Sequence, residues 1–251
     1  MAHFYDCNDT LDAFLRDDIT TVAQARKVRA IFPSVTTVLG ICKDEFLDSI
    51  YKPSKMVELG RENPHLHWRE IERLCYGMRQ HPTDGSLIPS SEFGTAVHYR
   101  IEELVQAQLH GHEIGESPYQ EWAAPFLEWM QVCEVKPIAT ECVVADKLIK
   151  IAGSIDFIGY DNEGKLFLAD YKCRTNTKGK AKCYDKDCQQ LGIEAYMLMK
   201  ERKLDYLPGC ISVIIDCDTK KHHHKVWDDK ELDKGIKVAK KCAELYWLLR
   251  M

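Results

Sequence analysis

Three features are absent from this sequence of 251 residues. It has no run of about 18 apolar residues, which excludes a conventional membrane-spanning helix, and the opening MAHFYDCND is too acidic and too poor in apolar residues for a secretion signal. It has no excess of positive charge either, because 34 basic residues stand against 39 acidic ones and give a formal net charge of −5. We therefore expect a soluble, cytoplasmic protein with no membrane partner, in which any nucleic-acid binding depends on a local basic patch.

Cysteine pairs at metal-binding spacing are also scarce. The chain has 11 cysteines, and their scattered positions, with no Cys-x-x-Cys pair, favour free thiols in a reducing compartment over a disulfide framework. Cys183 and Cys188 stand near each other in a polar segment and are candidate zinc ligands, but no second pair follows at finger-like spacing. With 45% hydrophobic and 29% charged residues, the composition is that of a globular protein with a sizeable core.

The first third of the chain is expected to be helical. Apolar spacing and capping residues predict helices at 8–30, 33–40, 43–51 and 55–81. The segment 81–91, HPTDGSLIPSS, is predicted to be a loop from its proline, glycine and serine content. We therefore assign residues 1–90 to an N-terminal helical lobe and residues 91–251 to the main domain.

In the remainder of the chain, apolar residues recur in some segments at the helical spacing of three to four and in others at the strand spacing of two. This mixture predicts an α/β core. Helices are expected at 92–110, 118–134, 187–201 and 229–250, with a kink or break at Pro125. Strands are expected at 139–145, 150–159, 166–172, 209–217 and 222–227. His222, His223 and His224 are consecutive on a strand and point to alternate faces, so we interpret them as surface residues and not as a metal site.

The segment from Ala152 to Lys172, AGSIDFIGYDNEGKLFLADYK, has the pattern of a β-hairpin that carries acidic residues. Its first strand contains Asp156, and a turn follows around 161–164. On the second strand, alternation places Asp170 and Lys172 on one face behind two leucines, while Phe167, Ala169 and Tyr171 take the other face. A register that lays Asp156 beside Asp170 would create a pair of carboxylates next to a lysine.

Two close carboxylates repel each other unless a cation joins them. Mg²⁺ prefers such hard oxygen ligands and usually keeps several waters, so Lys172 would lie beside a metal-bound water. The alternative interpretation is an ordinary strand end with a surface ion pair, worth about 0–1 kcal/mol. The tripeptide Asp-x-Lys is common, so a choice between a metal site and a surface ion pair needs further motifs along the chain.

The helix predicted at 92–110 places two ionisable groups on an apolar face. Steps of three and four residues align His98 and Glu102 with Ile101, Val105 and Leu109. Burying both groups without a partner would cost several kcal/mol, so they need a wet cavity or a site beneath them. The alternative is a partly exposed pair at i,i+4 that contributes a few tenths of a kcal/mol.

A basic segment and a glutamine follow the hairpin. Between residues 172 and 186 one acid, Asp185, stands against six basic residues, namely Lys172, Arg174, Lys178, Lys180, Lys182 and Lys186. This local reversal of charge predicts phosphate contact beside the acidic site, and a solvated surface loop is the alternative. On the next helix, Gln190 shares a face with Ile193, Glu194 and Met197 and can lean over the strands.

Taken in chain order, these motifs resemble one family. The helix with GTAVH and Glu102, the strand with Glu141, and the segments GSIDFI, LADYK and QLGIEAYML are similar to the RecB-type and mitochondrial-genome-maintenance-type exonucleases of the PD-(D/E)XK nuclease superfamily, and to small bacteriophage exonucleases. The opening FPSVTTVL, with Ser34 and Thr36, resembles the Pro-Ser-x-Thr segment that precedes the core of such enzymes. The matching motifs span residues 33–196, and the proline of the superfamily's name is missing before Asp156. The resemblance implies a restriction-endonuclease-like core, with a central mixed β-sheet flanked by helices.

The resemblance also implies roles for individual residues in a metal-dependent DNA exonuclease. Asp156, Asp170 and the backbone carbonyl of Tyr171 would bind Mg²⁺ or Mn²⁺, and His98 would approach the same metal or a second one, supported by Glu102. Lys172 would orient the attacking water and help to deprotonate it, and Gln190 would steady Lys172 or the nucleotide. The basic residues Arg174, Lys178, Lys180 and Lys182, together with Ser34 and Thr36, would contact nucleic acid.

The sequence departs from the family pattern in ways that bear on the site. Glu194 stands four residues after Gln190, where relatives often have tyrosine, so Gln189 remains an alternative for the inward-facing glutamine. Some RecB-like relatives hold an iron–sulfur cluster, but here only Cys210, Cys217 and Cys242 follow the core, widely spaced, and no cluster is expected.

Three functions therefore stand as hypotheses. The first is an exonuclease on DNA ends, preferring single strands, in replication, recombination or repair; the resemblance to bacteriophage enzymes implies a bacterial host cytoplasm and a recombination or replication protein as partner. The second is a structure-specific endonuclease of the same superfamily. The third is a DNA-binding scaffold that does not cut, although paired carboxylates facing phosphate would add nothing to a binding surface.

Overall fold

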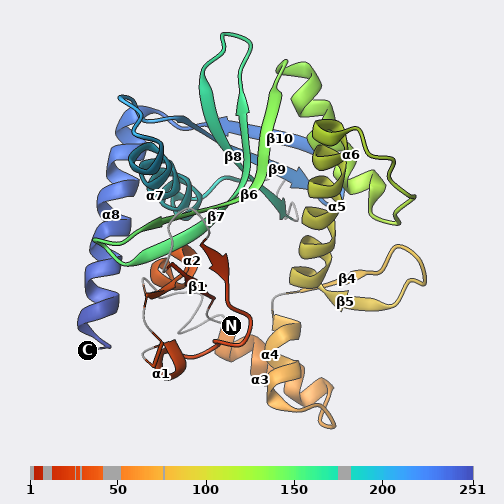
Figure 1. The fold of residues 1–251 in the computed structure, drawn as a ribbon. Coiled ribbons are helices and arrows are strands. Elements are labelled where there is room, and N and C mark those ends of the chain that lie inside the picture. Colours follow the sequence, from red (N-terminus) through yellow and green to blue (C-terminus); the bar gives the residue numbers. More distant parts are fainter. Residues whose placement is uncertain are drawn as a thin grey trace.

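The structure is a computed structural model that describes residues 3–7, 13–25, 27–28, 30–41, 52–75, 77–174 and 182–250. A mixed five-stranded sheet of order β10-β9-β8-β7-β6 forms its centre (Figure 1). Its strands are β6 (Lys136–Asp146), β7 (Ile151–Tyr160), β8 (Leu166–Arg174), β9 (Gly209–Asp216) and β10 (Lys221–Val226). β6, β7 and β8 form an antiparallel meander, β9 runs parallel to β8, and β10 is antiparallel to β9. The predicted α/β class with a central mixed sheet is confirmed.

Helices cover both faces of this sheet. α5 (Ser90–His110) and α6 (Gln120–Val132) lie on one side, and α7 (Asp185–Arg202) and α8 (Asp229–Leu248) lie on the other (Figure 1). α6 is a single helix with Pro125 inside it, so of the predicted kink or break the break is not found.

Strand β8 separates two hydrophobic cores. Phe167, Ala169 and Tyr171 are buried with the apolar residues of α5 and α6, whereas Leu168 is buried with those of α7 and α8. The alternation predicted from the sequence is therefore confirmed, because successive side chains of a strand point to opposite faces. The sheet is covered on both sides, which leaves polar side chains of β8 inside the protein.

The N-terminal part is less helical than predicted. The helix expected at 8–30 is wrong in the described residues, which instead contain β2 (Phe14–Leu15) and a single turn, α1 (Val22–Ala25). β1 (Phe4–Asp6) pairs with both β2 and β3 (Ile31–Pro33) in a small antiparallel sheet. Apolar residues from both sides of this stretch pack together in a small cluster, so a tertiary contact satisfies them in place of a helical face.

The stretch predicted as one helix at 55–81 consists of two helices and a strand. α3 (Lys52–Glu62) ends just before Asn63 and Pro64, where a proline disfavours helical geometry in the preceding residue. α4 (Trp68–Cys75) follows, and Gly77, with a φ of 88°, turns the chain into β4 (Met78–Gln80). β4 pairs with β5 (Leu87–Pro89), so the segment predicted as a loop is partly a hairpin. The helix predicted at 43–51 lies outside the described residues.

The helix predicted from Ser34 to Gly40 is present as α2 (Val35–Leu39). Ser34 caps it, since its Oγ accepts a hydrogen bond from the Thr37 N–H at 3.0 Å. Val35, Val38 and Leu39 are buried in the same core as α7 and α8. The N-terminal segment thus contributes to the main core, and the domain boundary at residue 90 stays a prediction.

Among the described residues, no helix combines the length and the apolar character needed to cross a membrane.

Candidate active site

Strands β7 and β8 separate in the middle of the sheet. Their pairing runs from Tyr160 opposite Leu166 to Phe157 opposite Ala169 and stops there. Both strands nevertheless continue, β7 in its pairing with β6 and β8 in its pairing with β9. The next residues beyond the last pair are Asp156 and Asp170, so the two carboxylates flank the point where the strands part.

Backbone groups that β7 no longer pairs become available at this point. The Tyr171 N–H donates to Asp156 Oδ2 at 3.3 Å instead of to a β7 carbonyl. The side chain of Tyr171 points the other way, into the aromatic core, where its ring lies 4.4 Å from the ring of His98 and 4.8 Å from that of Phe126. The strand separation therefore leaves Asp156 hydrogen-bonded to the Tyr171 N–H and close to Asp170, and the metal-binding role of the Tyr171 carbonyl stays a prediction.

Lys172 lies directly against Asp170. Its Nζ is 2.5 Å from Asp170 Oδ1, and the Asp170 side chain is only 1% exposed. The second oxygen, Asp170 Oδ2, is buried and has no hydrogen-bond partner among the described residues. A buried carboxylate oxygen without a protein partner is costly, so this atom is free to accept a hydrogen bond or to bind a cation.

The charges around Lys172 are unbalanced toward the negative. Burial alone would disfavour its ammonium, but the carboxylates of Asp170 and Asp156 outweigh burial and raise the pKa of Lys172 above its ordinary value. Burial raises the pKa of Asp156 well above its usual range; Lys172 opposes this, and Asp170 and Glu141 add to it. One lysine thus serves several carboxylates, and a further cation would relieve the remaining repulsion.

Glu194 is a third buried carboxylate at the site. Sequence analysis placed it on the helix face of Gln190 and noted it as a departure from the family pattern, but did not count it as a site residue. It is 2% exposed on α7. Burial raises the pKa of Glu194 well above normal, with further contributions from Asp170 and Asp156, while Lys172 and a hydrogen bond from Gln190 lower it. The signal in the sequence was an acid four residues after a glutamine on an otherwise apolar helix face.

The approach of Glu194 to the sheet depends on a glycine. A Cβ at Gly153 on β7 would lie 3.0 Å from Glu194 Oε1 and 3.1 Å from Val35 Cγ2. Gln189, the alternative inward residue, instead lines a small cavity with Trp227 and residues of α8. Gln190 is therefore the glutamine that faces the carboxylate cluster.

Glu141 enters the site from β6 through an unusual backbone conformation. Its φ is 50°, in the left-handed region that a non-glycine residue rarely adopts. Its Oε2 accepts a hydrogen bond from Ser154 Oγ at 2.7 Å, and its charge contributes to raising the pKa of Asp156. Residues in such strained conformations cluster at functional sites, and sequence analysis placed Glu141 on a regular strand.

A cleft of about 440 Å³ opens over these residues from the side of α5. His98, Tyr99 and Glu102 of α5 line it together with Glu141 and Lys172. His98 Nδ1 is 3.7 Å from Asp156 Oδ2. Burial and the charge of Lys172 lower the pKa of His98 to about 3, so its imidazole is neutral at pH 7. Burial and the neighbouring Glu141 raise the pKa of Glu102.

The basic residues predicted to contact nucleic acid have different surroundings. Arg174 forms a two-pronged ion pair with Asp187 at 2.6 and 2.8 Å, and its guanidinium lies 4.6 Å from the centre of the Tyr184 ring. This arrangement ties the end of β8 to the start of α7. Lys182 is exposed just before α7, and Lys178 and Lys180 lie outside the described residues.

The two N-terminal candidates lie near the start of β7, at the edge that β8 leaves, because Ala152 pairs with Ala145 of β6 on its other edge. Ser34 is buried and bridges to Ala152 of β7, with its hydroxyl engaged in capping α2. Thr36 is exposed in the first turn of α2. Ser34 therefore positions α2 beside the strand that carries Asp156, and the nucleic-acid contacts of both residues stay predictions.

The donor atoms suit a hard divalent cation. No group of three or more His, Cys, Asp or Glu side chains in the described part of the chain is arranged as a ready metal site. Mg²⁺, however, is usually held by one or two carboxylates, with waters and substrate oxygens completing its shell. The carboxylate of Asp156 and the partnerless Oδ2 of Asp170 supply oxygens of this kind, whereas the Tyr171 carbonyl stays a predicted ligand. These residues therefore fit Mg²⁺ or Mn²⁺.

Comparisons with known proteins add little to this geometry. No family model matches the chain, and no curated protein matches it. Among solved structures, the crystal structure of SSO0001 is similar with a TM-score of 0.36 and 14% identity, covering 82% of this chain and 73% of that one. The crystal structure of LHK-Exo in complex with dAMP is similar with a TM-score of 0.27 and 17% identity, covering 61% of this chain and 83% of that one. At these scores neither similarity carries an argument about function.

Proposed function

We propose that this protein is a deoxyribonuclease that depends on Mg²⁺ or Mn²⁺ and hydrolyses phosphodiester bonds at DNA ends, with a preference for single strands. The observation that supports this most is the parting of β7 and β8 at Asp156 and Asp170, beside Lys172 and a buried carboxylate oxygen without a partner. A purely structural ion pair would not need the strands to separate there.

In this proposal Asp156, Asp170 and the Tyr171 carbonyl hold the metal. The metal would supply charge neutralisation at the scissile phosphate and a more acidic bound water. His98, neutral because of its lowered pKa, would be available as a further ligand without adding positive charge. Glu102 and Glu141 line the same cleft and add negative charge near its mouth, which favours cation binding over entry of phosphate alone.

Lys172 orients the attacking water and a phosphate oxygen. Its pKa is raised by the two carboxylates, so its ammonium donates hydrogen bonds and cannot accept a proton while those charges are unbalanced. It can assist deprotonation only once a cation offsets them. Water then attacks phosphorus in line, the bond to the 3′ oxygen breaks, and the products carry a 5′ phosphate and a 3′ hydroxyl.

The remaining predicted residues act around this centre. Gln190 donates to Glu194 and so keeps that carboxylate in place beside Lys172 and the two aspartates. Lys178, Lys180 and Lys182 guide the DNA backbone. Arg174 holds the end of β8 against the start of α7 through its ion pair with Asp187. The biological setting we propose is replication, recombination or repair, with a protein of one of these processes as partner.

The test is cleavage of end-labelled DNA by purified protein that has been freed of metal and then supplied with Mg²⁺ or Mn²⁺. We expect degradation of linear single strands, no cleavage with chelator, and intact covalently closed circles. Asp170→Asn and Lys172→Met are expected to abolish cleavage, whereas Glu163→Gln and Lys165→Ala, two exposed substitutions near the turn of the same hairpin, keep it.

Each alternative gives a different result in this assay. Cleavage of circles would replace the exonuclease with an endonuclease of the same chemistry. DNA binding without cleavage under any metal condition would favour the scaffold. Cleavage that persists in Asp170→Asn and Lys172→Met would reject the proposed site.

A further inference from the structure

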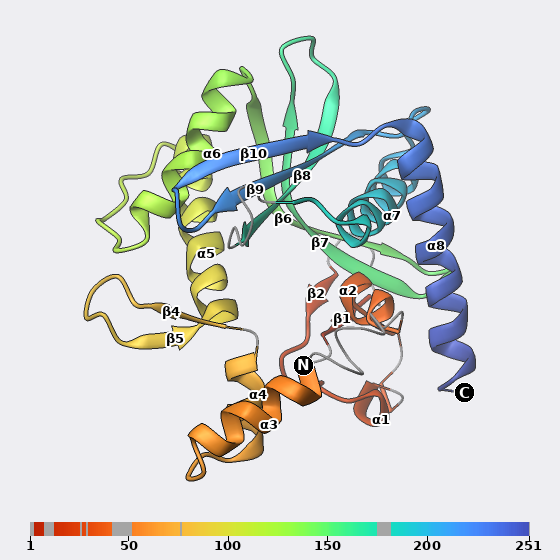
Figure 2. The same ribbon diagram turned by 180° about the vertical axis from the view of Figure 1, so that it is seen from behind.

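The sheet has a basic edge strand. β10, with the sequence KHHHKV, is the last strand of the five-stranded sheet in the described part of the chain, and only β9 pairs with it. Figure 2 shows it extending from α6 toward α8 at the outer side of the sheet. An edge strand presents unpaired N–H and C=O groups that can pair with another extended chain. No acidic residue interrupts it.

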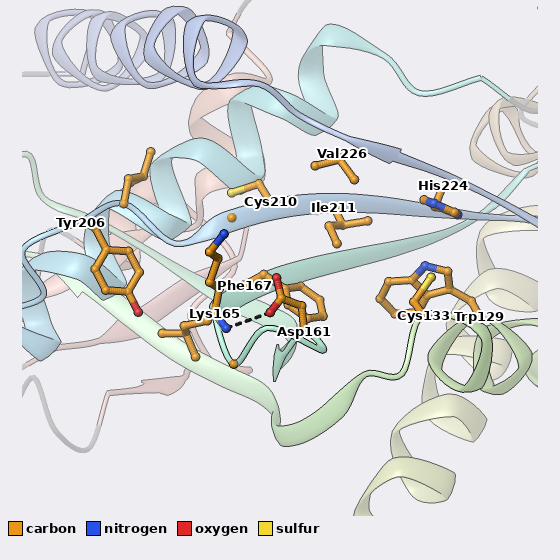
Figure 3. A pocket seen from close by; sticks show the side chains of 14 residues that line it. Trp129, Cys133, Asp161, Lys165, Phe167, Tyr206, Cys210, Ile211, His224 and Val226 are labelled. Atoms are coloured by element: carbon orange, nitrogen blue, oxygen red, sulfur yellow. Dashed lines mark hydrogen bonds between the residues drawn. The ribbon is translucent and has the colours of Figure 1, made fainter.

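An apolar pocket of about 640 Å³ opens next to this strand, away from the carboxylate cluster. Val226 of β10 and Ile211 of β9 form one wall, and Tyr206 lies at the far end (Figure 3). Val226 is 63% exposed and Tyr206 is 47% exposed. These side chains leave an apolar hollow open to solvent beside the free strand edge.

A buried donor without a partner lines the same pocket. Trp129 is fully buried, and its Nε1 has no hydrogen-bond partner in the part of the chain that the structure describes. The indole lies 6.5 Å from the ring of His224, and Figure 3 shows its nitrogen turned toward that histidine. The buried indole therefore contributes an apolar wall to the pocket.

The two faces of β10 differ in charge. His222 lies 3.9 Å from Glu128 of α6, and His224 faces Trp129, so these two residues and Val226 point to the side of the pocket. Lys225 pairs with Glu231 of α8 at 2.7 Å, so Lys221 and Lys225 point to the opposite side. Lys221 is exposed and has no ion pair among the described residues.

We infer that this edge strand and its pocket, which we call the β10 surface, bind an extended acidic segment of a partner protein as an added strand. The segment alternates acidic and apolar residues. Its acidic side chains lie on the face of Lys221 and Lys225, where opposite charges on neighbouring strands attract. Its apolar side chains lie on the other face and enter the pocket beside Val226 and Ile211.

The chemistry of the surface favours a peptide over DNA. A DNA backbone would be attracted by the lysines, but it would leave the pocket and the strand edge unused and would meet Glu128, which is exposed on the pocket side. A peptide strand satisfies the edge through main-chain hydrogen bonds and gains specificity from pockets for alternate side chains. The inference is independent of the proposed nuclease activity, because the β10 surface shares no residue with that site.

The experiment uses the full chain and fluorescein-labelled seven-residue peptides in which glutamate alternates with leucine, valine, phenylalanine or methionine. Binding is measured by fluorescence anisotropy. We expect saturable binding by at least one peptide, and loss of that binding when lysine replaces every glutamate. Two further versions of the binding peptide carry N-methyl groups on odd or on even residues; one is expected to lose binding and the other to keep it, since only one edge of an added strand pairs.

Variants of exposed residues locate the site on the protein. Val226→Asp is expected to weaken binding about tenfold or more, because it repels the acidic segment and places a charge beside the apolar pocket, and Lys221→Glu is expected to weaken it less. Val57→Asp, at a valine of α3 that is 56% exposed, is the matched control and keeps full binding.

Three outcomes would overturn the inference. The first is that none of the four peptides binds saturably, and the second is that both N-methylated versions bind equally. The third is that a labelled single-stranded oligonucleotide, and no peptide, binds in a way that Val226→Asp weakens, which would assign the surface to nucleic acid.

Discussion

The two ends of the β7–β8 hairpin use one backbone pattern for different purposes. Near the turn, Tyr160 pairs with Leu166, the ladder is closed, and apolar residues face both cores. Beyond Phe157 and Ala169 the two strands are no longer paired with each other. The side chains at this open end are Asp156, Asp170 and Lys172. The difference shows that position on the strand, and not composition of the strand as a whole, decides where chemistry can take place.

The closed end contributes stability and the open end stores unfavourable charge. Leu168 is fully buried and gains free energy from burial. Asp170 is equally buried, but one of its oxygens has no partner, and its neighbours Asp156 and Glu194 have raised pKa values because of burial. Functional sites often carry such local costs, which the rest of the fold offsets.

The largest expected effect is a loss of nuclease activity from a substitution at the open end of the hairpin, compared with one near the turn. Asp156→Asn removes a proposed metal ligand at the open end while keeping its shape, and we expect nuclease activity to fall by about 10³-fold, the size of effect seen when key electrostatic groups are removed. Asp161→Asn, at the turn of the same hairpin, keeps an acceptor for the Lys165 N–H and is the matched control. Initial rates of DNA degradation give the comparison, and similar rates for both variants would contradict it.

The second prediction concerns the closed end of the hairpin, where a substitution should reduce stability and leave activity unchanged. Leu168→Ala creates a cavity between β8 and the helices α7 and α8, and it is expected to lower the free energy of unfolding by about 2–5 kcal/mol. Urea denaturation measures this, with Leu148→Ala, at a leucine that is 83% exposed, as the control. Activity per folded molecule should stay near that of the unaltered protein. A loss of activity larger than the loss of folded protein would mean that the two ends are coupled.

Much of this hairpin could be predicted from the sequence because its pattern is local. A period of two along Leu166 to Lys172 is enough to assign faces, and the turn residues limit the register that brings Asp156 beside Asp170. The amphipathic helices at 92–110 and 229–250 were predictable for the same reason, since their apolar spacing repeats over several turns.

Other features depend on contacts between distant parts of the chain. Phe4 pairs with Pro33, and a window of neighbouring residues does not contain that information, so the described residues between them were wrongly predicted as a helix. Glu194 becomes part of the carboxylate cluster only because α7 crosses β7 at Gly153. The left-handed conformation of Glu141 likewise follows from the sheet around it and not from its own preference.

A smaller effect tests that crossing. Gly153→Ala places a Cβ 3.0 Å from Glu194 Oε1 and 3.1 Å from Val35 Cγ2, so α2 or α7 must shift. We expect the free energy of unfolding to fall by about 1–3 kcal/mol, with a partial loss of activity. Gly60→Ala in α3, where the nearest atom would be 3.6 Å away, is the control and should not destabilise the protein. Equal unfolding curves for both variants would show that α7 tolerates displacement.

The smallest effect concerns Glu194 alone. Its pKa is raised in the folded protein, chiefly by burial, so the folded state binds its proton more tightly than the unfolded state does. The free energy of unfolding of the metal-free protein should therefore fall as pH rises from the ordinary glutamate pKa, about 4.3, through the raised folded value. Glu194→Gln removes this contribution, and the stability curve should become flatter toward high pH, with Asp156 responsible for the slope that remains.

The same substitution has a modest predicted effect on catalysis, because Glu194 acts through Gln190 and Lys172 and not by direct contact with substrate. Outer groups of this kind typically change activity by about 10- to 100-fold, and we expect the lower end of that range, since glutamine keeps the shape of the side chain. Glu201→Gln on the same helix is the control for activity. A loss of activity as large as that of Asp156→Asn would make Glu194 a direct ligand. An unchanged dependence of stability on pH would mean that Lys172 balances the Glu194 carboxylate in the folded protein, so that the open end of the hairpin carries less unfavourable charge than we infer.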